Sequence, residues 1–137
     1  MFKYSTQIRV RYAETDQMNV VYHGNYAQYF EAARGEAIRS LGITYSEIEK
    51  AGIIMPVVEL NIKYLRPAHY DELISVVTEL RDWPEDHRIR FYHEVYNESG
   101  KLLTTGSILL YFLNASDKGK TKMPDMMTER LKDFFNS

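Results

Sequence analysis

The stretch TDQMNVVYHGN places one carboxylate, Asp16, seven residues before His23. Asp16 lies in a polar turn, and a helical pattern of apolar side chains follows His23 and Gly24. The first backbone N–H groups of a helix have no partner within it and lie at the positive end of its dipole, so they can stabilise a developing oxyanion. Gly24 has no side chain to block the approach. Asp16 can therefore serve as a general base for water or as a nucleophile, although an Asp in such a turn also suits an Asx turn.

These groups suit an acyl compound whose leaving group needs no proton donor. A thiol with a pKa of about 8.5 leaves as a thiolate, whereas an amide nitrogen requires a general acid. The chain has no cysteine and lacks the GxSxG, GxGxxG, P-loop and HExxH patterns, which removes support for serine and cysteine hydrolases. His87 and His93 fall on one predicted strand without a third ligand, so we expect neither a metal nor an organic cofactor. The residues point to thioester chemistry.

Hydrophobic periodicity predicts the elements that position these residues. Alternation over residues 4–12 indicates a first strand with Tyr12 on its apolar face. Apolar residues spaced by three and four from Tyr26 to Leu41 predict one long helix, which Gly42 ends. Thr44 begins a shorter helix. The remaining predicted elements are four strands, 53–65, 73–83, 87–96 and 102–113, and a terminal helix, 123–135, with Pro124 in its first turn.

This order of elements predicts an α+β fold in a single domain, residues 1–137. Strands that are segregated from helices and joined by short turns favour antiparallel pairing. We expect a meander of the four later strands and the N-terminal strand to form one antiparallel five-stranded sheet wrapped around the long central helix. One face of this sheet is expected to meet another subunit.

Charge and composition exclude several classes of protein. With 17 Lys and Arg against 19 Asp and Glu, the chain has no broad basic surface for nucleic acid or an anionic membrane. No apolar run has the length of a signal-peptide core or an integral membrane segment. The absence of cysteine is compatible with a reducing compartment, so we expect a cytoplasmic protein.

The opening stretch also resembles a known family. YAETDQMNVVYHGNYAQYFEAAR is similar to the motif of hotdog-fold acyl-CoA thioesterases of the 4-hydroxybenzoyl-CoA thioesterase family, especially the Tol-Pal-associated branch. YLRPAHYDEL resembles that family's Arg-Pro-Ala turn. The resemblance implies a hotdog fold, an acyl-CoA substrate, and a homo-oligomer, either a dimer or a dimer of dimers (a homotetramer), with each site at a subunit interface. It implies that Asp16 is the catalytic carboxylate, that the N–H of His23 is the oxyanion donor, and that Tyr12 lies near the carboxylate.

Three residues are expected to contact the substrate. Gly24 and Tyr26 lie at the helix start, although Tyr26 also suits the core. Arg66 is the contact we select for the phosphates of coenzyme A. It comes from a set of strand basic residues, Lys63, Arg66, Arg88 and Arg90. Asn19 stands where relatives commonly carry Gly, and Asn tolerates left-handed backbone angles better than most residues.

Other functions remain open from the sequence. The thioester could be carried by acyl carrier protein instead of coenzyme A, or the chain could be an acyl-CoA-binding module without catalysis. A hotdog dehydratase would pair a His before the helix with a carboxylate inside it, which fits the turn-borne Asp16 less well. The length and aromatic character of the acyl group depend on pocket depth, which one sequence does not reveal.

Overall fold

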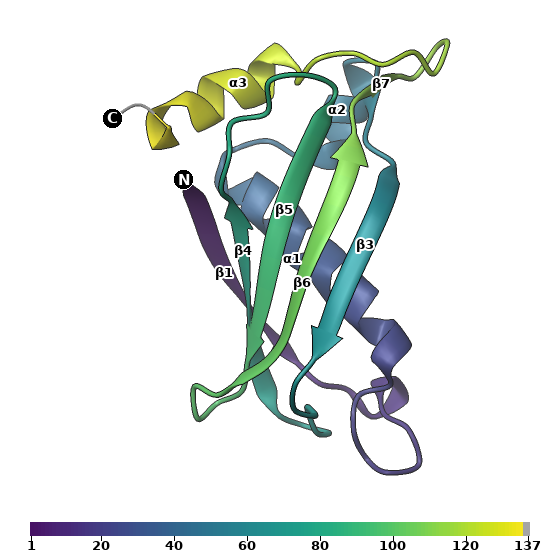
Figure 1. The fold of residues 1–137 in the computed structure, drawn as a ribbon, viewed down its shortest axis with the longest axis vertical. Coiled ribbons are helices and arrows are strands. Elements are labelled where there is room, and N and C mark those ends of the chain that lie inside the picture. Colours follow the sequence, from purple (N-terminus) through teal and green to yellow (C-terminus); the bar gives the residue numbers. More distant parts are fainter. Residues whose placement is uncertain (136–137) are drawn as a thin grey trace.

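The computed structural model describes residues 1–135 and shows one antiparallel sheet curved around a central helix, α1 (Tyr26–Ser40) (Figure 1). The sheet has five strands in the order β1-β4-β5-β6-β3. Their bounds are β1 Phe2–Arg9, β3 Val57–Tyr64, β4 Leu73–Leu80, β5 Arg88–Tyr96 and β6 Leu102–Tyr111. This arrangement confirms the predicted α+β fold and the sheet wrapped around a long helix.

Shorter elements lie at both ends of the sheet. Two 3-10 turns precede α1 in the chain, Tyr12–Glu14 and His23–Asn25. At the other end, near the C-terminus of α1, lie α2 (Tyr45–Lys50), the two-stranded pair β2 (Ile53–Ile54) and β7 (Leu113–Asn114), α3 (Asp125–Leu131) and a last 3-10 turn, Lys132–Phe134 (Figure 1). None of the helices within residues 1–135 is both long and apolar enough to cross a membrane.

The predicted four-strand meander is wrong for one strand. Strands β4, β5 and β6 are consecutive neighbours, but β3 pairs with β6 at the far edge instead of with β4. The connection after β3 crosses the end of the sheet, because Leu65 and Arg66 donate their N–H groups to the carbonyl of Leu103 while Asp71 donates to that of Val10. Strand periodicity carries no information on this crossing. Because β3 is the last strand in the order of the sheet, it forms an exposed edge.

Several predicted boundaries also shift. The first strand ends at Arg9, so Tyr12 lies in a 3-10 turn and not on a strand face. The run 53–65 divides at Pro56 into β2 and β3, because proline cannot donate to a ladder. Pro124 caps α3 and does not lie in its first turn. In contrast, Gly42 ends the long helix with φ +88°, and Thr44 accepts a hydrogen bond from the N–H of Glu47, as predicted.

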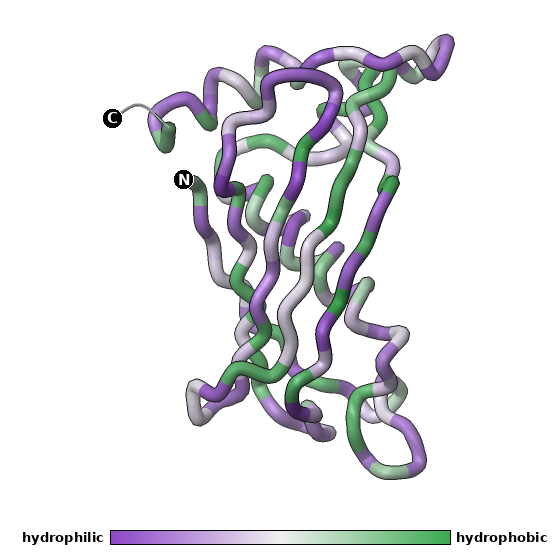
Figure 2. Tube along the Cα trace, in the orientation of Figure 1, coloured by the Kyte–Doolittle hydropathy of each residue, from purple (hydrophilic) through white to green (hydrophobic). Residues whose placement is uncertain are grey.

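The core lies between α1 and the concave face of the sheet. Apolar and polar residues alternate along the strands, as the tube in Figure 2 shows. Phe30 and Ala33 of α1 are fully buried, as predicted for its apolar stripe. His93 is only 1% exposed and stacks on Phe30 with ring centroids 4.6 Å apart. His93 is therefore a core residue and does not face solvent.

Candidate functional site

The segment between β1 and α1 forms a loop below the start of α1 (Figure 1), and backbone hydrogen bonds place Asp16 at the start of a short hairpin turn within it. Its N–H donates to the carbonyl of Val20 and its carbonyl accepts from Asn19, while Thr15 and Val21 form an antiparallel bridge. A three-residue hairpin loop requires a left-handed backbone angle at its last residue. Asn19 occupies this position and has φ +66°. The departure from glycine at this position is therefore tolerated.

The side chain of Asp16 is exposed and only partly engaged. Its Oδ1 accepts a hydrogen bond of 2.8 Å from the N–H of Met18, which is an Asx turn. The Asx role weighed from the sequence is thus present. One oxygen fixes the carboxylate in the loop, and within the described residues no other hydrogen bond to this carboxylate is formed.

The same hairpin contains a second acid, Glu14, which the sequence did not single out. Its Oε1 accepts from the N–H of Arg11 at 2.8 Å and from the hydroxyl of Tyr29 at 2.9 Å, and its Oε2 accepts from the Arg11 guanidinium. Burial alone would raise the pKa of Glu14, but the hydrogen bonds from Arg11 and Tyr29 outweigh it and hold the pKa below its usual value. The carbonyl of Glu14 also accepts from Tyr22 and Asn25. Glu14 therefore fixes the hairpin to the first turns of the helix.

The helix start has free backbone donors. Asn25 donates its N–H to Tyr22 and Tyr26 donates to His23, but within residues 1–135 the N–H groups of His23 and Gly24 make no hydrogen bond. A Cβ at Gly24 would lie 2.7 Å from the ring of Tyr22, so the glycine allows this ring to pack closely. The predicted oxyanion donor is thus available, in a 3-10 turn that leads directly into α1.

Aromatic rings surround these donors. The ring of His23 lies 4.3 Å from that of Tyr22, and the hydroxyl of Tyr64, at the end of β3, donates to the carbonyl of His23 at 3.0 Å. Tyr26 is 2% exposed, and its ring packs against that of Tyr64 at 5.4 Å. Tyr26 is therefore a core residue, whereas the rings of Tyr22 and Tyr64 are exposed beside the helix start.

Two stretches that are far apart in the sequence meet here. Val21 donates its N–H to Ala68, and Val20 and His69 form an antiparallel bridge, so the Arg-Pro-Ala turn lies against the Asp16 hairpin. Arg66 begins this turn and is exposed, with one weak contact of 3.4 Å to the carbonyl of Leu102. The structure thus places the two motifs side by side at one end of the sheet.

Tyr12 lies on the outside of the same end. Its side chain is 73% exposed and its ring contacts that of Tyr70 edge to face at 5.7 Å. Together with Met18, which is 80% exposed, these rings leave an apolar surface next to the hairpin. Exposed apolar surface of this kind marks a place where a ligand or another chain binds.

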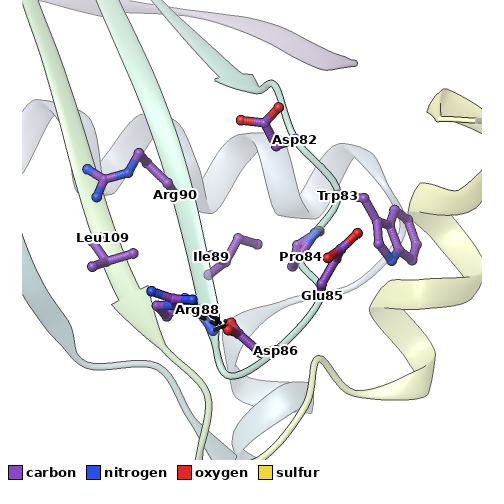
Figure 3. Close-up of a pocket in the computed structure, with 9 residues that line it drawn as sticks. All are labelled: Asp82, Trp83, Pro84, Glu85, Asp86, Arg88, Ile89, Arg90 and Leu109. Atoms are coloured by element: carbon purple, nitrogen blue, oxygen red, sulfur yellow. Dashed lines mark hydrogen bonds and ion pairs between the residues drawn. The ribbon is translucent and has the colours of Figure 1, made fainter.

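The other basic residues do not join Arg66. Arg88 pairs with Asp86 at 2.7 Å and Arg90 lies 3.8 Å from Glu59, at the opposite end of the sheet. They border a hollow of about 560 Å³ beside the β4–β5 connection (Figure 3). Its two arginines already pair with carboxylates, and it lies far from the Asp16 hairpin. Lys63 borders a separate hollow with Arg81 and Tyr92. The predicted basic set is therefore dispersed, and Arg66 lies in the turn next to the hairpin.

The fold and this site define a class of protein. Residues 10–131 match the profile of the thioesterase-like superfamily, and the chain belongs to this family. The family match and the structural neighbours confirm the resemblance and the hotdog fold predicted from the sequence.

Named relatives and solved structures agree with this family. The chain is 46% identical over 96 residues, 70% of this chain and 69% of the relative, to YneP of Bacillus subtilis (strain 168), which has a provisional name as an acyl-CoA thioesterase. It is 26% identical over 103 residues, 75% of this chain and 76% of the relative, to the acyl-CoA thioester hydrolase YbgC of Escherichia coli O6:H1. The structure of a DHNA-CoA thioesterase from Staphylococcus aureus superposes with a TM-score of 0.86 and 36% identity, covering 100% of this chain and 97% of that one.

Proposed function

We propose that this chain hydrolyses an acyl-CoA thioester to the free acid and coenzyme A, with Asp16 as the carboxylate that activates water or attacks the acyl group. The family and the named relatives confirm the predicted enzyme class, a thioester hydrolase. The observation that supports the proposed site is the pair of unbonded N–H groups at His23 and Gly24, next to a hairpin whose carboxylate keeps one oxygen free.

The chemistry follows from these groups. With Asp16 as base, its carboxylate removes a proton from water as the water oxygen bonds to the thioester carbon. The carbonyl oxygen becomes an oxyanion and accepts hydrogen bonds from the N–H groups of His23 and Gly24. The carbon–sulfur bond then breaks, the coenzyme A thiolate leaves, and the proton held by Asp16 returns to the thiolate or to solvent. With Asp16 as nucleophile, its oxygen bonds to the thioester carbon first, and the carbon–sulfur bond breaks as the coenzyme A thiolate leaves. Water then hydrolyses the resulting mixed anhydride, which releases the free acid, regenerates the carboxylate of Asp16 and leaves a proton for the thiolate or solvent.

The remaining predicted contacts fit this scheme in part. Tyr12 lies at the outer side of the hairpin, and Arg66 is an exposed cation at the same end of the sheet for the phosphates of coenzyme A. Tyr26 is buried, so it supports the helix start from the core and does not contact the substrate in this scheme. Because a thiolate is a good leaving group, no metal or organic cofactor is needed. We place the reaction in the cytoplasm, which the absence of cysteine supports.

We also propose that a second copy of the chain completes the acyl pocket. Strand β3 is a sheet edge with unpaired backbone groups, and its apolar side chains are exposed at Val57, Leu60 and Tyr64. Such an edge is open to pairing with another strand, and a second β3 would cover it. A dimer, or a dimer of dimers, would then close the space between α1 and β3. Sedimentation of the purified chain at several concentrations would test this, and a mass of one chain throughout would contradict it.

The activity is tested by release of free thiol from short, long, branched and aromatic acyl-CoAs. The proposal predicts catalytic release from at least one of them. If acyl-CoA raises the thermal unfolding temperature but no thiol appears at any chain length, the chain is a binding module. If thiol is released only from thioesters of acyl carrier protein, the substrate is an acylated carrier protein and not acyl-CoA.

A further inference from the structure

Arg34 is a buried cation without a partner in the middle of α1. The residue is 4% exposed, and its Nε and one terminal nitrogen make no hydrogen bond within the described residues. The hydroxyl of Tyr45, at the start of α2, lies near Arg34 and is also buried without a hydrogen bond of good geometry among residues 1–135. An unpaired charge in a protein interior is costly, and buried charges are normally paired. Two adjacent groups in this condition indicate that a bound acceptor satisfies them.

Both side chains line a cavity of about 320 Å³ between α1, α2 and the first residues of β3. Its other walls are mainly apolar, formed by Ile48, Ile53, Met55, Val57 and Leu110. Glu31 and Glu49 also border it, but both are exposed, and no ion pair of either with Arg34 is formed in the part of the chain that the structure describes. A mainly apolar cavity with a few fixed polar donors is typical of a small-molecule site.

Among the described residues that line the cavity, Arg34 is the only cation. His93 lies near Arg34, but burial, together with the nearby Arg34 cation, lowers the pKa of His93 to about 3, so the imidazole is neutral at physiological pH. The donors that a ligand would meet are therefore one guanidinium and one phenol. A guanidinium forms paired hydrogen bonds with a carboxylate more readily than with any neutral acceptor.

The cavity lies on the same side of α1 as the exposed inner face of β3. Leu60, Ile62 and Tyr64 pair with the inward-facing residues of β6, and Tyr64 contacts His23. Apolar side chains of β3 therefore lie between the helix start and the end of the strand that borders the Arg34 cavity. Eight residues of helix separate Tyr26 from Arg34, which corresponds to about 12 Å. An extended chain covers this distance in about ten bonds.

We propose that the Arg34–Tyr45 cavity binds a carboxylate at the far end of the acyl group, so that the enzyme prefers thioesters of dicarboxylic acids. The inference rests on the proposed function, because it assumes that the thioester carbon lies at His23. The acyl chain then follows β3, and its terminal carboxylate accepts hydrogen bonds from Arg34 and Tyr45.

The test compares matched substrates on the purified full chain. Plain acyl-CoAs of about eight, ten and twelve carbons are compared with the same chains carrying a terminal carboxylate, and kcat/KM for thiol release is measured for each. We expect the carboxylated substrate to be favoured by at least about tenfold at one length, the equivalent of about 1.4 kcal/mol. Thiol release without such a preference at any length would overturn the subsite and leave the proposed function standing. No release from any acyl-CoA would instead overturn the proposed function.

Substitutions at Arg34 and Tyr45 test whether these side chains cause the preference for carboxylated substrates. Arg34→Met is expected to reduce the ratio of carboxylated to plain kcat/KM to near one, and Tyr45→Phe to lower it about three- to tenfold, the loss expected for one hydrogen bond. Arg39→Met is the matched control, since Arg39 lies on the same helix, is exposed and pairs with Glu36, and its ratio should equal that of the wild type. If Arg34→Met does not fold, Tyr45→Phe still decides the matter, because an unchanged ratio there contradicts the proposal. A preference that appears only after Glu31→Gln would show that Glu31 neutralises Arg34 and would also contradict it.

Discussion

Replacing Asp16 by Asn separates the chemical role of this side chain from its structural role. The Asx turn uses Oδ1 as the acceptor for the N–H of Met18 at 2.8 Å, and the amide oxygen of Asn can accept the same hydrogen bond. The side chain is exposed, so no core contact is lost. We therefore expect Asp16→Asn to change the free energy of unfolding by less than about 0.5 kcal/mol.

Activity should respond much more strongly than stability. A positioned general base contributes about 10²- to 10⁴-fold, which at about 1.4 kcal/mol per factor of ten corresponds to a barrier increase of roughly 3–5 kcal/mol. The measurement is kcat for thiol release on the best acyl-CoA, together with the thermal unfolding temperature. Asp16→Ala serves as the comparison, since it removes both the carboxylate and the turn acceptor. It should be as inactive as Asp16→Asn and also less stable by about 1 kcal/mol.

Two results would refute this reasoning. If Asp16→Asn keeps activity within about threefold of the wild type, Asp16 is neither the base nor the nucleophile. If its unfolding temperature falls as far as that of Asp16→Ala, the amide does not reproduce the turn. The loss of rate would then be a structural effect.

Three further predictions concern packing and pH. A Cβ at Gly106 would lie 2.5 Å from the buried ring of Phe30, so Gly106→Ala should cost about 1–3 kcal/mol in urea unfolding, whereas Gly35→Ala, with nothing within 4 Å, should be neutral or stabilising. Burial lowers the pKa of His93 from 6.5 to about 3, so the unfolded chain binds more protons between these values. Stability should therefore fall as pH drops below about 6.5, by up to about 1.4 kcal/mol per pH unit, and His93→Gln should flatten this slope. The pKa of Glu14 is held below 4.5, so the stability this carboxylate provides is present above that pH and lost below it. Glu14→Gln should lower the unfolding temperature at pH 7, with a difference from wild type that shrinks in acid, and an equal difference at all pH values would contradict the assigned charge.

The helices and strands could largely be predicted from the sequence because buried apolar side chains recur with the period of each element. The stripe from Tyr26 through Phe30 to Leu41 gave the long helix, and Gly42 marked its end. The position of β3 could not be predicted in this way, since a strand reads the same whether it pairs with its neighbour in sequence or crosses to the far edge. The bulge between Val57 and Glu59, which shifts the alternation at the start of β3, was equally invisible.

The site was predicted in part for a similar reason. Asp16 and His23 stood out by type and spacing, and the motif resemblance gave them roles. The role of Glu14 depends on Tyr29, fifteen residues away, and nothing in the run YAETD indicates this contact. Arg34 did leave a signal, because it falls four residues after Phe30 and directly after Ala33, on or beside the buried stripe of the helix. A charged side chain at a buried position normally has a partner of opposite charge, so this position of Arg34 indicates that a partner or ligand is needed.

The two acids of the hairpin divide their roles according to how their oxygens are used. Both oxygens of Glu14 already accept hydrogen bonds, from Arg11 and Tyr29, and these bonds keep its pKa low. A carboxylate in this condition has no lone pair directed at water and little tendency to take a proton, so it is poorly suited to act as a base. Asp16 keeps an exposed oxygen free of protein donors, while its other oxygen holds the side chain in place. Glu14→Gln should therefore reduce mainly stability, and Asp16→Asn mainly the rate. The opposite pattern would assign the reaction to Glu14.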